Sequence, residues 1–382
     1  MQSIDMANVL RPPAQAYTLP PACYADPAIL AHEQAQLFVG GWVSAGRGDS
    51  LDKVGDYLAF SVSDTPLIAV RGDDSQLRVF ANTCRHRGMR LIEPGRGSCR
   101  HLVCPFHGWR YTLEGVLAAA PRMQGAENFD PADFGLVQVP CAQRSGFLFV
   151  NVDGNAGPID DWLGDFDALH QPWGLESLVT ASTREFSVAC NWKSFLEVFN
   201  EYYHLRKVHP GTFSALYDEP DVPEDARGAF VSQFGVHRHV GSVGVLEQSS
   251  SPLPVLPGLS GRLANGTRYT WVYPGLAFAA SRDAVWIFEV TPHGVAETGV
   301  RLTLLFDPHS VATGDFEAIL GRYEHRMAVG MDEDIAILEA QQLGLTSALA
   351  RPGRFCPELE PSIHAFHRWY AGRLVGAGLA HG

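Results

Sequence analysis

Two short segments of this chain, each with one cysteine and one histidine, constrain its fold more than any other feature. They are Cys84–His86, with the sequence CRH, and Cys104–His107, with the sequence CPFH. Gly88 and Gly108 follow the two histidines, at positions where a tight loop needs a permissive backbone. The fold must therefore bring two loops together, so that two thiols and two imidazoles meet at one site.

Two kinds of metal centre use such a set. In a Rieske [2Fe–2S] cluster, two cysteines bind one iron and two histidines replace cysteine at the other, which raises the reduction potential. Zinc also binds Cys₂His₂ sets, but the single residue between Cys84 and His86 is shorter than the usual zinc spacing of about two to four. The spacing therefore favours the cluster. We expect Cys99 and His101 not to bind metal, because they lie too close to Cys104 to form a separate facing loop.

A second group of potential ligands lies further along the chain. It consists of Glu197, Glu201, His204 and His209, with an acidic run at residues 332–334. Two histidines and one carboxylate form the facial triad of non-haem Fe(II) oxygenases, which leaves coordination positions open. The two histidines are about 140° apart on an ideal helix, so we expect the helix to distort or end between them. An isolated pattern of this kind would favour a solvated helix face with incidental histidines instead.

These motifs, in this order, resemble the α subunit of a Rieske-type non-haem iron oxygenase, the family of ring-hydroxylating and demethylating oxygenases. The resemblance covers nearly the whole chain and rests on GDYLAFSVSDTPLIAVRG, CRHRG, CPFHGWRY, NWKSFLEVFNEYYHLRKVHP and DEDIAILEAQQLGLTS. It implies an α+β fold, in which an all-β Rieske [2Fe-2S] domain precedes a helix-grip-like catalytic domain with an antiparallel sheet flanked by helices.

The resemblance also implies two cofactors, a [2Fe–2S] cluster and one Fe(II) ion. The implied cluster ligands are Cys84, His86, Cys104 and His107. The implied Fe(II) ligands are His204, His209 and Asp334, with Asp332 as the alternative carboxylate.

Glu201 departs from most of the family, which has an aspartate three residues before the first histidine ligand. The resemblance implies that this carboxylate links His107 of one subunit to His204 of its neighbour, in the head-to-tail trimer that the family forms. A carboxylate that accepts two imidazole N–H bonds orients both rings and provides an electron path between subunits. A minority with glutamate here resembles carnitine and glycine-betaine oxygenases, but Val198 replaces the asparagine of their motif.

The hydrophobic pattern predicts three segments. These are an N-terminal helical segment at 1–42, the β-rich Rieske domain at 43–155 and the catalytic domain at 156–382. A long irregular region at about 210–265 is interpreted as a lid over the active site, with a passive surface insertion as the alternative.

The candidate substrate pocket consists mainly of apolar and aromatic residues, although core packing alone would explain any one of them. The candidates are Phe195, Val198, Phe199, Asn200, Trp271, Tyr273 and Trp286.

The net charge is −13, yet the cluster region at residues 84–110 is rich in arginine and has a single acid. A basic patch in an acidic protein indicates an acidic partner, and the family's electron donors are reductases or ferredoxins. Internal pairing is the alternative for some of these arginines. The acidic balance argues against nucleic acid, and no apolar run reaches the roughly 18 residues of a membrane span. The scattered cysteines indicate a reducing compartment, and we expect a cytoplasmic protein.

Three functions remain open. The first is a terminal oxygenase component that takes NAD(P)H-derived electrons from a reductase or ferredoxin and uses O₂ to hydroxylate or demethylate a small organic substrate. The second is a cis-dihydroxylating aromatic ring dioxygenase with the same ligands. The third is a non-enzymatic iron–sulfur or zinc-stabilised binding protein, which the facial-triad residues argue against. Glu201 favours the first function, while the substrate is not determined by the sequence.

Overall fold

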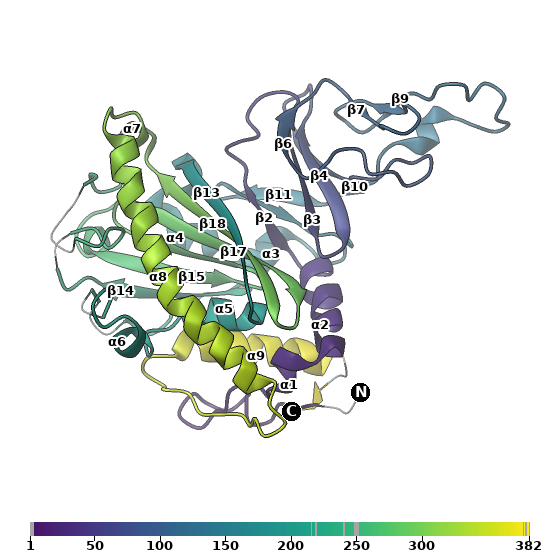
Figure 1. Cartoon of the computed structure of the whole chain (residues 1–382). Coiled ribbons are helices and arrows are strands. Elements are labelled where there is room, and N and C mark those ends of the chain that lie inside the picture. Colours follow the sequence, from purple (N-terminus) through teal and green to yellow (C-terminus); the bar gives the residue numbers. More distant parts are fainter. Residues whose placement is uncertain are drawn as a thin grey trace. The chain divides into compact units, whose positions relative to one another are not determined.

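The computed structural model describes residues 4–376, 378 and 380–381, apart from 215, 218–219, 240 and 248–251. These residues form two compact units (Figure 1). The smaller unit is Ala35–Ile159, and the larger combines Met1–Gln34 with Asp160–Gly382. Most of the N-terminal segment therefore belongs to the larger unit. The sequence predicted domain boundaries after residues 42 and 155, whereas the structure divides the chain after residues 34 and 159.

The smaller unit consists mainly of short strands, in agreement with the alternating apolar runs of its sequence. Its elements are η1 (Gln34–Val39), β2 (Val43–Arg47), β3 (Asp56–Val62), β4 (Thr65–Arg71), β5 (Leu77–Ala81), β6 (Gly95–Ser98), β7 (Leu102–Val103), β8 (Arg110–Tyr111), β9 (Leu117–Ala119), η2 (Pro131–Phe134), β10 (Gln138–Val139), β11 (Cys141–Arg144) and β12 (Phe147–Val150). They form three antiparallel sheets among the described residues, in the orders β10-β5-β4-β3-β6, β11-β12-β2 and β7-β8-β9.

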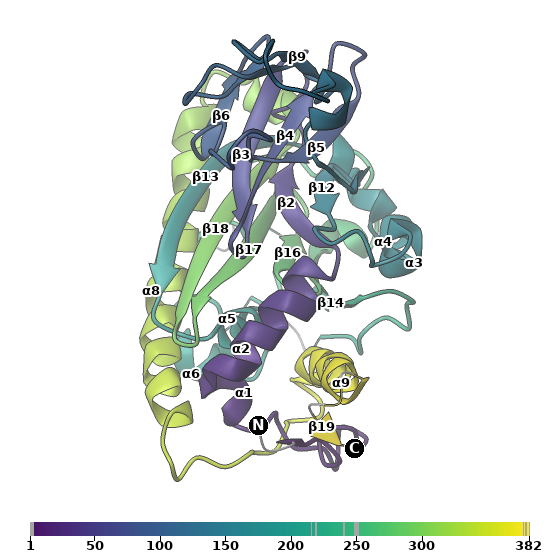
Figure 2. The ribbon, with the colours of Figure 1, turned by 90° about the vertical axis from the view of Figure 1, so that its right-hand side faces the viewer.

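The larger unit is built on one antiparallel sheet with the order β13-β18-β17-β16-β15-β14. Its strands are β13 (Val179–Val188), β14 (Phe230–Val236), β15 (Gly266–Val272), β16 (Leu276–Ala280), β17 (Val285–Gly294) and β18 (Glu297–Phe306). Its helices are α1 (Ala22–Ala25), α2 (Pro27–Glu33), α3 (Ile159–Leu163), α4 (Phe166–His170), η3 (Gln171–Trp173), η4 (Leu175–Ser177), α5 (Trp192–Phe199), α6 (Leu205–Val208), η5 (Leu263–Asn265), α7 (Pro308–Val311), α8 (Phe316–Leu345) and α9 (Pro361–Gly376). Near the chain ends, β1 (Ile4–Asp5) pairs with β19 (Ala380–His381) in parallel. Figure 2 shows both ends of the chain near β19.

Helices cover both faces of this sheet, because alternate residues of each strand point to opposite sides. On one face, Phe288 packs against Phe195 of α5 with ring centroids 5.5 Å apart, and Trp271 stacks on Phe366 of α9 at 3.9 Å. On the other face, Phe278 packs against α4. The fold therefore has the predicted form of an antiparallel sheet flanked by helices.

A buried ion pair fixes α5 between α2 and α9. The Lys193 ammonium lies 2.7 Å from Glu33 Oε1, and both side chains are fully buried. Trp192 Nε1 also donates to Glu33 at 2.7 Å, and Tyr370 OH donates to the same carboxylate. Removal of one partner from such a pair leaves a buried, uncompensated charge, so the position of α5 is tightly determined.

The predicted irregular region at 210–265 is interrupted by a strand. Residues Phe230–Val236 form β14, which pairs with β15 along its whole length at the edge of the sheet. Ser232 and Gln233 make this segment look like a loop in the sequence, but both side chains are buried and hydrogen-bonded. Residues 215, 218–219, 240 and 248–251 of the predicted lid lie outside the described residues.

A chain of hydrogen bonds is buried between α4 and the sheet. His170 Nδ1 donates to the Phe166 carbonyl at 2.7 Å, so its Nε2 accepts from Thr270 Oγ1 at 2.7 Å. Thr270 in turn lies 2.9 Å from Ser232 Oγ. Burial lowers the pKa of His170 to about 3. Protonation of Nε2 would remove the acceptor of the hydrogen bond from Thr270 and would place a charge in the core.

We therefore predict that acid destabilises the protein through His170. Since the pKa is lower in the folded than in the unfolded state, the contribution is complete above about pH 6.5 and is lost as the pH falls toward about 3. Between pH 6.5 and 5 the loss should reach about 2 kcal/mol. Urea titrations at pH 6.5 and pH 5 should measure the free energy of unfolding of the wild type and of His170→Asn. The difference between the two proteins should be smaller at pH 5 by this amount. A difference that is the same at both pH values would contradict the prediction.

Candidate metal centres and active site

The two loops of the smaller unit have the same backbone hydrogen bonds. In the first, Cys84 N donates to the Met89 carbonyl at 2.8 Å, and Gly88 N donates to the Cys84 carbonyl at 3.0 Å. In the second, the matching bonds join Cys104 to Trp109 at 2.8 Å and Gly108 to Cys104 at 3.1 Å. Both glycines have positive φ, 73° and 71°, which a side chain would strain. The two loops therefore have the same backbone hydrogen-bond pattern, although His86 lies two residues after its cysteine and His107 lies three residues after its own.

The four cluster candidates lie in two layers. Cys84 and Cys104 are each only 2% exposed, whereas His86 is partly exposed and His107 is exposed. The two Nδ1 atoms lie 3.2 Å apart, and the His86 ring stacks on Trp109. Two buried thiols and two outer imidazoles fit a cluster whose inner iron is held by sulfur and whose outer iron is held by nitrogen.

In the larger unit, α5 ends where the sequence requires it to end. Asn191 caps its first turn by accepting from Lys193 N at 3.2 Å, and the helix stops at Phe199. Glu201 then accepts from the backbone N–H groups of the next residues, at 3.2 Å for His204. A carboxylate that bonds to local N–H groups competes with continued helix formation. His204 and His209 consequently lie just before and just after the short helix α6.

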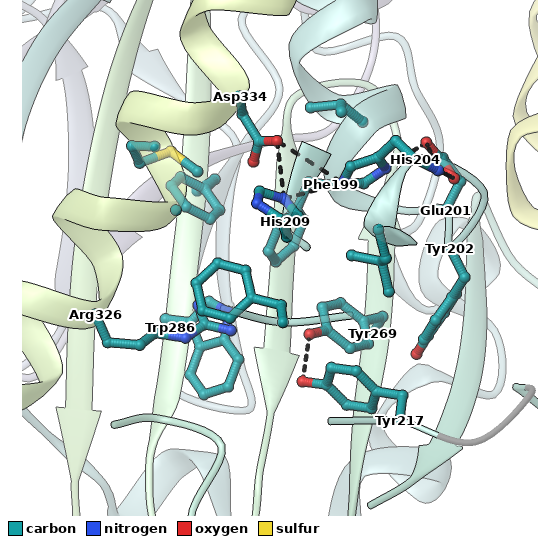
Figure 3. Close-up of a pocket in the computed structure, with 16 residues that line it drawn as sticks. Phe199, Glu201, Tyr202, His204, His209, Tyr217, Tyr269, Trp286, Arg326 and Asp334 are labelled. Carbon is teal, nitrogen blue, oxygen red and sulfur yellow. Dashed lines mark hydrogen bonds and ion pairs between the residues drawn. The ribbon is translucent and has the colours of Figure 1, made fainter. Parts of the chain in front are cut away.

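Asp334 of α8 meets the two histidines from the opposite side (Figure 3). His204 Nε2 and His209 Nε2 are 3.2 Å apart, and Asp334 Oδ1 lies 3.1 Å from the second and 3.7 Å from the first. Ligands at right angles around an ion with bonds of about 2.1 Å are separated by about 3 Å. Asp334 Oδ1 is buried and accepts no hydrogen bond. The three residues therefore fit a single Fe(II) ion.

Two further carboxylates orient these imidazoles. His204 Nδ1 donates to Glu201 Oε1 at 2.5 Å, and His209 Nδ1 donates to Glu333 Oε2 at 2.7 Å. Each contact leaves the Nε2 lone pair facing the metal position. Burial lowers the pKa of His204, but the hydrogen bond and charge of Glu201 outweigh it and raise the pKa above its ordinary value. Thr212 Oγ1 also donates to Glu333, at 2.9 Å.

The other acids near the site point elsewhere. Asp332, the alternative third ligand, is exposed and lines a different cavity on the far side of Met331. Glu197 accepts from Tyr24 OH at 2.7 Å and lies 2.9 Å from His367 Nε2, so it anchors α5 instead of facing the metal position.

A small cavity of about 60 Å³ opens beside the three ligands, with room for a few water molecules. It is lined by Val198, Phe199, Glu201, Tyr202, His204, Leu205, His209, Phe213, Tyr217, Tyr269, Trp286, Phe288, Arg326, Gly330, Met331 and Asp334. Of the predicted pocket residues, Val198, Phe199 and Trp286 are among them.

The other four predicted pocket residues do not line this cavity. Phe195 lies one turn before Phe199 and packs against the sheet, while Asn200 Nδ2 donates to the Leu196 carbonyl at 2.7 Å. Trp271 and Tyr273 point to the correct face of the sheet but lie further along β15 and beyond it, beneath α9. Sequence spacing alone gives no information about where along a strand a cavity ends.

Several lining residues were not predicted. Tyr269 lies two residues before Trp271 on the same face, so the strand alternation could have suggested it. Arg326 and Gly330 precede Asp334 by eight and four residues on α8, a spacing that places them on one helix face. The only sequence feature that indicated Glu333 was its position next to Asp334. Phe213 and Tyr217 lie in the predicted lid and had no separate signal.

Comparison with known families identifies the chain. Residues 175–376 match the ring hydroxylating alpha subunit (catalytic domain) family, and residues 41–131 match the Rieske [2Fe-2S] domain. Because the first match covers more than half of the chain, the protein belongs to the ring-hydroxylating oxygenase α-subunit family.

Two relatives and one solved structure illustrate which proteins the chain is similar to. The chain is 28% identical to the glycine betaine monooxygenase oxygenase subunit of Chromohalobacter salexigens, over 97% of this chain and 88% of the relative. It is 33% identical to the carnitine monooxygenase oxygenase subunit of Acinetobacter baumannii, over 52% of this chain and 54% of the relative. The solved structure of a quaternary ammonium Rieske monooxygenase matches with a TM-score of 0.82 and 25% identity, over 100% of both chains.

The protein is therefore a Rieske non-haem iron oxygenase with a [2Fe–2S] cluster and Fe(II) as cofactors, and the predicted α+β fold is confirmed. It acts as the oxygenase subunit of a system that receives its electrons from a reductase. The alternatives of a zinc site and of a non-enzymatic binding protein do not agree with this family. Among the described residues, no helix is long and apolar enough to cross a membrane.

The contact between Glu333 and His209 predicts a loss of iron affinity on mutation. Loss of a carboxylate that orients a ligand histidine typically costs about 10–100-fold in metal affinity. Glu333→Ala should weaken Fe(II) binding in this range, measured by competition with a colorimetric chelator, while the cluster absorption stays unchanged. Asp332→Ala is the matched control, because this neighbour is exposed. Equal affinities for Glu333→Ala and the wild type would contradict the assignment.

Proposed function

We propose that this oxygenase hydroxylates an N-methyl carbon of a small quaternary ammonium compound, with His204, His209 and Asp334 as the ligands of Fe(II). The observation that carries this proposal is the small size of the cavity beside these ligands and its aromatic wall. The names of the relatives, which are glycine betaine, carnitine and choline monooxygenases, support the same substrate class.

The wall supplies ring faces to a methylated cation. The Phe199 ring meets Tyr269 at 5.4 Å and Phe288 at 4.7 Å, both nearly edge to face. All three rings line the cavity, and aromatic faces attract quaternary ammonium groups. Val198, where the betaine and carnitine motif has asparagine, adds a further apolar surface.

The proposed reaction balances without further co-reactants. A methylated ammonium, O₂, two electrons and two protons give the N-hydroxymethyl ammonium and water, and this product releases formaldehyde, a proton and the tertiary amine. The Fe(II) ion supplies the activation of O₂ when it is bound. The chain's own residues would hold the ion by two Nε2 atoms and one carboxylate. Glu201 and Glu333 accept hydrogen bonds from the two Nδ1–H groups, and aromatic rings exclude bulk water.

We further propose that Glu201 joins two copies of the chain in a homotrimer. Its carboxylate already accepts from His204 Nδ1, and a carboxylate has lone pairs for further donors. His107 of a second copy, whose imidazole is exposed, is the proposed second donor. Tyr203, two residues after Glu201, is 60% exposed, which suits a residue that a neighbouring copy covers. Electrons would pass between subunits along these hydrogen bonds.

The electron donor, a reductase or a ferredoxin, is proposed to dock on the cluster loops. Arg85, Arg87, Arg90, Arg96, Arg100 and Arg110 are all exposed there. Two apolar residues beside the histidines are also exposed, Phe106 by 55% and Met89 by 39%. An acidic partner with an apolar centre would complement this face. The cysteines, none of which forms a disulfide, support the proposal of a cytoplasmic protein.

The substrate proposal predicts formaldehyde formation. Reduced, iron-loaded protein with O₂ should release formaldehyde from glycine betaine or a related N-methylated compound, detected by a colorimetric assay. Asp334→Ala should abolish the release and keep the cluster absorption. Formation of a cis-diol from an aromatic acid, with no formaldehyde from any methylated amine, would favour the dihydroxylating alternative.

The bridge proposal predicts a separate defect. Glu201→Gln should keep both metals but lower turnover by at least about 10–100-fold, because the neutral amide orients two imidazoles poorly. Reoxidation of the reduced cluster, followed by its visible absorption in a single turnover, should slow in parallel. Glu197→Gln, in the last turn of α5, serves as the control, because this carboxylate does not contact His204. Normal reoxidation in the iron-replete Glu201→Gln protein would rule out the bridge.

A further inference from the structure

One charged side chain in the active-site cavity has no part in the function proposed above. Arg326 of α8 lines the cavity and is only 8% exposed. Its Nε has no hydrogen-bond partner, and its Nη1 reaches only the Met327 sulfur, at 3.5 Å. In the part of the chain that the structure describes, no carboxylate forms an ion pair with it.

This burial is costly for the folded protein. A guanidinium remains charged at every accessible pH and has five N–H donors to satisfy. Two aromatic faces compensate in part, because the Arg326 Cζ lies 4.2 Å from the Phe213 centroid and 4.9 Å from that of Trp286. Ring faces attract the charge but accept no directed pair of hydrogen bonds as a carboxylate does. The donors of Arg326 are therefore available to a ligand.

The helix places this guanidinium and the metal ligands along one cavity. Arg326, Gly330 and Asp334 repeat every four residues on α8 and all line it, and Figure 3 shows Arg326 beside Trp286 and Asp334 further along the helix. Eight residues correspond to about 12 Å along the helix axis. A Cβ at Gly330 would approach Phe213 to 2.8 Å, so this glycine leaves room for the Phe213 ring in the cavity wall.

The charges of the cavity are unequal at its two ends. At the metal end, the two positive charges of Fe(II) are offset by the carboxylates of Asp334, Glu201 and Glu333, which leaves about one negative charge. At the other end, no carboxylate of a described residue pairs with the charge of Arg326. A ligand that fills the cavity therefore gains most from an anionic group at Arg326.

We propose that Arg326 binds a carboxylate of the substrate, so that the substrate is a small zwitterion with a methylated ammonium and a carboxylate. This inference rests on the proposed function and narrows it, since a quaternary ammonium alcohol without an anion would leave the guanidinium unpaired. The carboxylate accepts from the free N–H donors of Arg326, and the methylated nitrogen lies toward the metal ligands. Arg326 thereby determines specificity and sets the direction in which the substrate enters the site.

Binding measurements on the iron-loaded protein without O₂ test this proposal. Calorimetric titration should use three probes of similar size: glycine betaine, choline, which lacks the carboxylate, and 3,3-dimethylbutanoate, which lacks the cationic nitrogen. The proteins are the wild type, Arg326→Gln, Arg326→Lys and the control Arg322→Gln. Arg322 lies one turn earlier on α8 and pairs with Glu247.

The wild type should bind glycine betaine more tightly than choline. Arg326→Gln should weaken glycine betaine about 10–100-fold, the range for loss of a charged hydrogen bond, and leave choline unchanged or improved. Arg326→Lys should recover part of the preference, and Arg322→Gln should match the wild type. Equal binding of choline and glycine betaine by the wild type, or equal weakening of both in Arg326→Gln, would overturn the proposal.

The three probes separate this inference from the proposed function. If 3,3-dimethylbutanoate binds as tightly as glycine betaine and both depend on Arg326, the anion site stands and the quaternary ammonium substrate does not. If choline and glycine betaine bind equally and 3,3-dimethylbutanoate does not bind, the substrate class stands and the anion site does not. The comparison of probes on the wild type remains decisive even if Arg326→Gln fails to fold.

Discussion

The end of α5 at Phe199 is the constraint on which the rest of the active site depends. Two histidines five residues apart cannot face one ion from a regular helix, so the backbone must leave the helix between them. Glu201 makes this possible by accepting backbone N–H groups within the turn, and the same carboxylate holds the Nδ1 proton of His204. The buried pair of Glu33 and Lys193 fixes the helix from behind. The path of the backbone after α5 and the orientation of the His204 ring therefore both depend on Glu201.

Carboxylates near the metal position have different tasks because they lie in different surroundings. Asp334 leaves a buried oxygen without a hydrogen bond, as a metal ligand requires, whereas Glu201 and Glu333 accept from imidazoles and act through them. Arg326, at the other end of the same cavity, forms no ion pair with any carboxylate among the described residues. This separation of charge gives a small, aromatic cavity a direction, which a symmetric apolar pocket would lack.

The sequence could predict the ligands but not the cavity. Residue type and spacing indicated Cys84, His86, Cys104 and His107 as cluster ligands. The resemblance to the family indicated His204, His209 and Asp334, with Asp332 as the alternative carboxylate. The cavity wall depends on which residues of a strand lie beneath which helix. The side chains of Trp271 and Tyr269 lie on the same face of β15. Tyr269 lines the cavity, whereas α9 packs on Trp271. The strand β14 was missed because its buried polar residues resemble those of a loop.

The most direct test of the metal site uses nitric oxide as a surrogate for O₂. The mononuclear iron–nitrosyl EPR signal should be recorded on reduced, iron-loaded protein, with the cluster signal of the same sample as an internal reference. The account predicts an iron–nitrosyl signal that changes on addition of glycine betaine, and its loss in His209→Ala with the cluster signal intact. A signal that persists in His209→Ala, or that responds to aromatic acids and not to glycine betaine, would contradict it.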